Sequence, residues 1–76
     1  MNNKRRKEIE RMICILESAK GDVELILQEE QDYYDAMPEN MQQGDKGTAA
    51  EEAVNNLESA VGELESVLGS LEEAKN

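Results

Sequence analysis

The residues of this chain that could do chemistry fall into a basic group and an aromatic group. The basic side chains gather near the N-terminus, at Lys4, Arg5, Arg6 and Arg11. Arginine side chains match the oxygens of a phosphate bidentately, and tyrosine faces can stack on a nucleobase. The two tyrosines, Tyr33 and Tyr34, lie far along the chain. If folding or subunit association brings the groups together, they form a nucleotide pocket; otherwise the basic group is a solvated end.

Other chemistry is poorly supported. Histidine is absent and Cys14 is the single cysteine. A serine or cysteine nucleophile therefore has no ordinary base partner, and neither a soft-metal site nor an intramolecular disulfide is expected. We predict a protein that is not an enzyme and needs no cofactor. Because Cys14 stands between two isoleucines, we expect it to be a small buried apolar residue.

The net charge of −10 is unevenly distributed. The first eleven residues carry five basic and two acidic side chains, a net charge of +3, which leaves −13 on the remainder. An acidic body repels the phosphate backbone, so we expect no binding to duplex nucleic acid. The basic end suits an acidic surface on the same molecule, on a second copy or on another molecule.

No apolar run is long enough for a membrane helix or a signal peptide. The run "MICIL" has five residues, whereas a membrane-spanning helix needs about 20. We therefore expect a cytoplasmic protein with no membrane partner.

Apolar residues in the first half recur at alternating intervals of three and four. The stripe, with one acidic member, is Ile9, Met12, Leu16, Ala19, Val23, Ile26, Glu30, Tyr33 and Met37, widened on one flank by Ile13, Leu27 and Tyr34. This spacing predicts a helix over about residues 3–37. Gly21 and Asp22 form a weak point, but the repeat keeps its phase across them, so one continuous helix is favoured over two. Glu30 either sets the register of the seam or pairs with a basic terminus.

The second half contains three versions of one heptad, "AVNNLES", "AVGELES" and "VLGSLEE". Its seam is Ala53, Leu57, Ala60, Leu64, Val67 and Leu71, widened by Val54, Val61 and Leu68. Thr48 with Glu51 three residues later makes a capping box, which predicts a helix over about residues 49–75. Gly62 and Gly69 fall at the outermost heptad position.

Residues 38–48 connect the two predicted helices. Pro38 should end the first helix, "PENMQ" could form a short extra turn, and Gly44 and Gly47 would let the chain reverse. The apolar and aromatic residues Tyr33, Tyr34, Met37 and Met41 favour an ordered, packed corner over a loose hinge. The predicted fold is a single all-α domain, residues 1–76, in which two long antiparallel helices form a helical hairpin.

We also expect this hairpin to associate with itself. The segments "MICIL" and "LIL" of the first helix are apolar nearly all the way round, so this helix needs a second apolar contact. The same surface of another copy across a two-fold axis is the simplest partner, giving a four-helix bundle dimer or a higher helical oligomer. In an antiparallel dimer the basic end of one chain would approach the corner of the other, where Glu29, Glu30, Asp32 and Asp35 lie.

The segment "YYDAMPENMQQGDKGTAAEEAVNNLESAVGELESVLGSLEEA", Tyr33 to Ala74, resembles a family of small helical-hairpin proteins of phages and prophages of Firmicutes. The shared pattern is an aromatic pair, D-x-M-P-E-N, a polar turn with glycine, and A-E-E-A followed by L-E-x-A repeats. The matching residues are Tyr33, Tyr34, Asp35, Met37, Pro38, Glu39, Asn40, Glu51, Glu52 and Ala53. The resemblance implies a phage-borne accessory protein in the bacterial cytoplasm, and such proteins often act against host defence.

We therefore expect a non-catalytic protein that acts stoichiometrically, by binding and blocking a host immune component. The candidate binding residues are Lys4, Arg5, Arg6, Arg11, Tyr33, Tyr34, Met37 and Asn40. One alternative is a sponge that sequesters a nucleotide immune messenger between subunits, since the expected architecture is similar to that of helical anti-CBASS sponges. Another is a structural or assembly protein of the phage.

Overall fold

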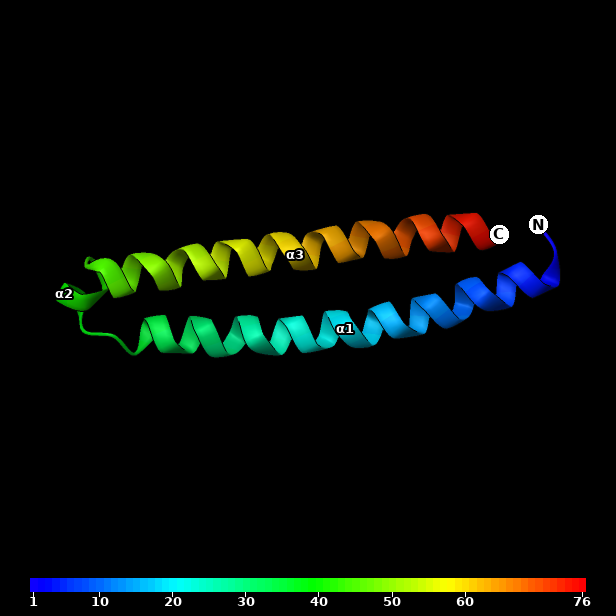
Figure 1. Ribbon diagram of the computed structural model, residues 1–76. Helices are drawn as coiled ribbons and strands as arrows, with labels where there is room; N and C mark the ends of the chain where they lie inside the picture. The colour runs from blue at the N-terminus through cyan, green and yellow to red at the C-terminus, as the bar shows by residue number, and fades with distance from the viewer.

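The protein is a helical hairpin in a computed structural model that describes residues 1–76. Its helices are α1 (Asn3–Asp35), α2 (Glu39–Gln42) and α3 (Asp45–Lys75), and it has no strand. Figure 1 shows α1 and α3 side by side and antiparallel, joined at one end through α2, with both termini at the other end. The rod measures 58 × 15 × 13 Å. These features confirm the predicted all-α class and the packing of two long helices, while the oligomeric state stays a prediction.

The helix α1 is continuous, as the unbroken repeat predicted. The carbonyl oxygen of the Asn2 side chain accepts a hydrogen bond of 2.9 Å from the Arg5 backbone N–H and so caps the first turn. Gly21 lies within the helix without interrupting it. The helix ends at Asp35, two residues before the predicted boundary, because the chain must leave helical geometry ahead of Pro38.

The helix α3 begins earlier than predicted. Its N-cap is Gly44, and the Thr48 backbone N–H donates a 2.9 Å hydrogen bond to the Gly44 carbonyl oxygen. Thr48 therefore lies inside the helix, and the capping box predicted for it is wrong. The carboxylate of Asp45 in the first turn complements the positive end of the helix dipole, which supports a start without a side-chain cap.

The seam of α1 follows the predicted stripe except at two residues of its C-terminal half. Towards the corner, Ile26 and Tyr33 are each 52% exposed, whereas their neighbours Leu27 and Tyr34 are half-buried against α3. A helix with 3.6 residues per turn drifts about 20° per heptad relative to a strict seven-residue repeat. The contact line moves accordingly from one flank of the stripe to the other, which corrects the prediction that Ile26 and Tyr33 lie in the seam.

The core is thin and lies mostly near the corner. Five of the 76 residues are buried, and they are Ile13, Met37, Gly47, Ala50 and Val54. Cys14 is exposed, contrary to the expectation that it would be buried, because it lies on the side of α1 away from α3. Glu30 is half-buried and forms no ion pair. Neither long helix has a stretch apolar enough to cross a membrane.

Candidate functional site

The candidate binding residues lie at opposite ends of the rod. Lys4, Arg5, Arg6 and Arg11 belong to the N-terminal part of α1, whereas Tyr33, Tyr34, Met37 and Asn40 belong to the corner. Since the rod is 58 Å long, one chain does not bring the basic and aromatic groups together. A nucleotide pocket made from both would require a second chain whose α1 runs in the opposite direction.

One of the four basic residues, Arg6, already forms hydrogen bonds within the hairpin. The Arg6 Nε atom donates a 3.1 Å hydrogen bond to the carbonyl oxygen of Lys75, and its terminal nitrogen lies 3.2 Å from the Asn3 side-chain oxygen. Arg6 thereby ties the start of α1 to the last turn of α3, where a positive charge is favourable. Lys4, Arg5 and Arg11 are exposed and form no ion pair within the chain.

The corner is ordered by contacts from three segments. The Gln42 side chain donates a 3.0 Å hydrogen bond to the Tyr34 carbonyl oxygen, which also accepts one of 3.1 Å from the Met37 backbone N–H at the end of α1. Met37 is buried, with 8% of its surface exposed. The short helix α2, which confirms the predicted extra turn in "PENMQ", begins after Pro38 as its N-cap.

The close approach of α2 and α3 depends on Gly47. A Cβ atom at this position would overlap the backbone of Gln42. Gly47 has no positive φ, so it is needed here for space and not for an unusual backbone conformation. The predicted packing of the corner is therefore confirmed at Met37 and Tyr34, whereas Tyr33 and Met41, which were expected to pack there too, are exposed.

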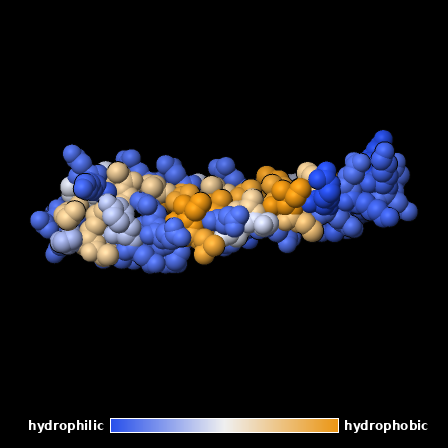
Figure 2. All heavy atoms as spheres, turned by 60° about the horizontal axis from the view of Figure 1, so that its bottom comes forward, coloured by the Kyte–Doolittle hydropathy of each residue, from blue (hydrophilic) through white to orange (hydrophobic).

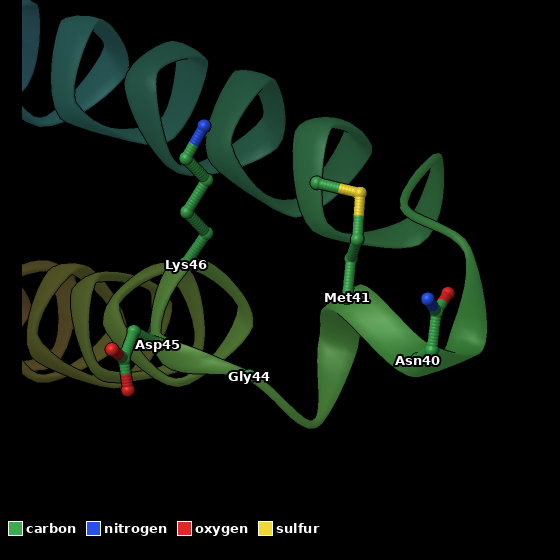
Figure 3. Close-up of a pocket in the computed structure, with 5 residues that line it drawn as sticks. All are labelled: Asn40, Met41, Gly44, Asp45 and Lys46. Atoms are coloured by element: carbon green, nitrogen blue, oxygen red, sulfur yellow. The ribbon is translucent and has the colours of Figure 1, made fainter.

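The outer surface of the corner presents Tyr33, Asn40 and Met41. Tyr33 is 52% exposed and Met41 is 40% exposed. Beside them is an open depression of about 270 Å³ lined by Asn40, Met41, Gly44, Asp45 and Lys46. Figure 3 shows the side chains of Met41 and Lys46 extending in the same direction, while the Asp45 carboxylate points away from them.

The sequence did not predict Asp45 and Lys46 as site residues, because the start of the second helix was placed after them. With one lysine and one carboxylate, the depression offers a polar edge next to an exposed methionine. It contains no nucleophile paired with a base. No three acidic or thiol side chains of the chain converge on a point that could hold a metal ion.

A second exposed apolar surface lies away from the corner. Ile15 is 50% exposed and Leu25 is 63% exposed, both on α1. Figure 2 shows apolar side chains gathered over the middle of this face, between strongly hydrophilic regions. Both side chains are half in water, in a chain with a small buried core.

Comparison with known proteins finds no relative of this chain. No protein-family model, no curated protein and no solved structure matches the chain.

Proposed function

We propose that this protein is a non-catalytic binding protein that acts stoichiometrically, with the corner as its docking surface for a host protein. The observation that carries the proposal is the exposure of Tyr33 and Met41 on an ordered turn, at 52% and 40%. Tyrosine is enriched at the energetic centres of protein interfaces, and a flexible methionine side chain can adapt its shape to a partner.

The fixed backbone of the corner supports this role. The hydrogen bond from Gln42 to Tyr34 and the close approach of Gly47 to Gln42 tie the turn to both long helices. A pre-ordered surface loses less conformational entropy on association, which favours tight binding by a small area.

The charge of the chain favours a basic partner surface. The body of the protein is strongly acidic, and acidic side chains border the corner on α1 at Asp32 and Asp35. Complementary charge speeds association and disfavours acidic partners. Together with the resemblance to phage accessory proteins, this supports a counter-defence inhibitor of a host immune protein as the particular role.

The burial of each corner residue decides which substitutions can test this proposal without disturbing the fold. Met37 is buried and Tyr34 is half-buried, so truncating either one would disturb the corner itself. Tyr33 and Met41 are exposed and can be changed with less effect on the fold. Val67, which is 45% exposed on α3 away from the corner, provides the control.

The experiment is quantitative capture from host lysate by the tagged wild-type protein, the double variant Tyr33→Ala/Met41→Ala and the control Val67→Ala. We expect one host protein to be retained by the wild type and the control and to be lost from the double variant, with helicity unchanged by circular dichroism. The captured protein should then bind purified wild type in a fixed ratio. Equal capture by all three proteins would contradict docking at the corner.

Calorimetry with cyclic nucleotides and ADP-ribose derivatives tests the alternative of a nucleotide sponge. Tight binding near one ligand per two chains would replace the host-protein proposal. We expect no such binding, because the Arg6 guanidinium already donates hydrogen bonds to the Lys75 carbonyl oxygen and the Asn3 side chain.

A further inference from the structure

The side of α1 that faces away from α3 has a regular order of chemical types. We call it the outer face and define it by two rows of residues spaced by seven: Lys4, Arg11, Ser18, Leu25 and Asp32 in the first row, and Glu8, Ile15, Asp22, Glu29 and Ala36 in the second. All ten are exposed. Their combined spacing alternates between four and three, so they form one continuous stripe along the helix.

Along this stripe the chemistry is nearly self-complementary. Lys4 and Arg11, with Glu8 between them, lie at its N-terminal end, and Ile15 follows. Ser18 and Asp22 occupy the middle, Leu25 comes next, and Glu29 and Asp32 lie towards the C-terminal end, which closes with Ala36. Such an order fits a copy of itself that runs in the opposite direction.

We propose that the outer face binds the outer face of a second copy, with the two α1 helices antiparallel and a two-fold axis that crosses the outer face between Ser18 and Asp22. In this register each member of the first row lies opposite a member of the second row. Leu25 then packs on Ile15 of the other copy, and Arg11 meets Glu29. Each of these contacts occurs twice, because the axis repeats it.

Other arrangements match less well. Moving the register by one heptad places Leu25 opposite Asp22 in one direction, or opposite Glu8 in the other. A parallel pair would place Arg11 against Arg11 and Glu29 against Glu29, which is repulsive. The proposed register contains one like-charged pair, Glu8 with Asp32. The basic residue Lys7 is adjacent to Glu8 in the chain and so lies near this pair.

The charges at the two ends of α1 also oppose the dipole of that helix. The first turn of α1 contains no acidic residue and its last turn contains no basic residue. Both ends therefore carry the charge that opposes the helix dipole. The neighbouring end of α3 compensates part of this through Arg6, but Lys4 and Arg11 form no ion pair. An antiparallel second copy brings opposite charge to both ends.

The exposed area is consistent with a missing partner. The chain exposes 5489 Å² at a mass of 8.5 kDa. A compact monomer of that mass exposes roughly 4,700 Å². The difference of about 800 Å² follows from the elongated shape of the hairpin, which leaves surface for a partner.

The proposed dimer also changes the corner. Lys4 and Lys7 of one copy would lie beside Tyr33 and Ala36 of the other, so each corner gains positive charge from its neighbour. The basic and aromatic groups that a single chain keeps apart would then meet between subunits. The dimer is argued from the outer face alone and does not depend on what the corner binds.

Charge exchange at the Arg11–Glu29 contact tests the register. Sedimentation equilibrium of the full chain gives the dissociation constant of the wild type and of Arg11→Glu, Glu29→Arg and the double variant Arg11→Glu/Glu29→Arg. Each single change introduces two repulsive pairs per dimer and should raise the dissociation constant about tenfold or more. The double variant restores both pairs and should return to within about threefold of the wild type.

The control is Glu63→Arg, which makes the same charge change at an exposed position of α3. It should leave the dissociation constant unchanged, and circular dichroism should show the same helicity for all five proteins. A wild type that stays monomeric at high micromolar concentration would overturn the proposal. The register would be overturned if the double variant had a dissociation constant as high as the single variants. It would also be overturned if Glu63→Arg raised the dissociation constant as much as Glu29→Arg.

Discussion

Gly47 in the first turns of α3 packs so closely against the backbone of Gln42 that a side chain at position 47 would overlap it. This contact fixes α2 against α3 and so sets the direction in which the chain returns from the corner. Because Gly47 is buried together with Met37 and Ala50, the contact belongs to the small core of the protein.

Replacing Gly47 by alanine should therefore destabilise the hairpin. The added methyl group must displace the Gln42 backbone, and overpacking of this kind costs about 1–3 kcal/mol. Urea unfolding at a fixed protein concentration measures the change, because self-association would make the midpoint depend on concentration. An unfolding free energy equal to that of the wild type would show that α2 moves freely.

Replacing Gly62 by alanine should have the opposite effect. Gly62 lies inside α3, is exposed, and has nothing within 4 Å of the place where a Cβ would be. Alanine restricts the unfolded chain and favours the helix, so we expect stabilisation of about 0.5–1 kcal/mol. The same urea titration gives the value, and a loss of stability would indicate a contact that a single chain does not show.

Replacing Gln42 by alanine should weaken the corner. The change removes the 3.0 Å hydrogen bond to the Tyr34 carbonyl oxygen. We expect a loss of about 1 kcal/mol, typical for one hydrogen bond of this kind. Gln43→Ala is the matched control, since Gln43 is exposed and its side chain forms no hydrogen bond. Equal unfolding free energies for the two variants would contradict the capping role of Gln42.

Replacing Arg6 by alanine should loosen the end of the rod opposite the corner. The Arg6 guanidinium holds the Lys75 carbonyl oxygen at 3.1 Å. We expect a small global effect, at most about 1 kcal/mol because the contact is partly exposed, together with faster amide exchange in the last turn of α3. Hydrogen exchange followed by NMR detects this change. Arg5→Ala should leave those amides as in the wild type, because Arg5 makes no side-chain contact of this kind.

The sequence determined the elements of this protein. Alternation of three- and four-residue intervals specified two long helices, because apolar side chains on one face must be buried together. The same periodicity indicated that Gly21 would not break α1, since a break would have shifted the repeat. Pro38 and the residues after it indicated a short turn and an ordered corner.

Only the tertiary structure decided which flank of the α1 stripe meets α3. Ile26 and Leu27 are adjacent, and a heptad pattern accepts either one. The choice follows from the angular drift of a nearly straight helix against its partner, which turns Ile26 into solvent and Leu27 towards α3. Cys14 was misjudged for a related reason, because its apolar neighbours do not reveal on which side of the helix it lies.

The start of α3 and the role of Gly47 were likewise set by long-range packing. A local capping signal at Thr48 was outweighed once α2 packed on the chain ahead of it and Gly44 became the first residue of the turn. Local sequence can mark where a helix is able to begin. Which of several possible starts is used depends on the contacts that the folded chain makes around it, and a linear pattern does not contain those contacts.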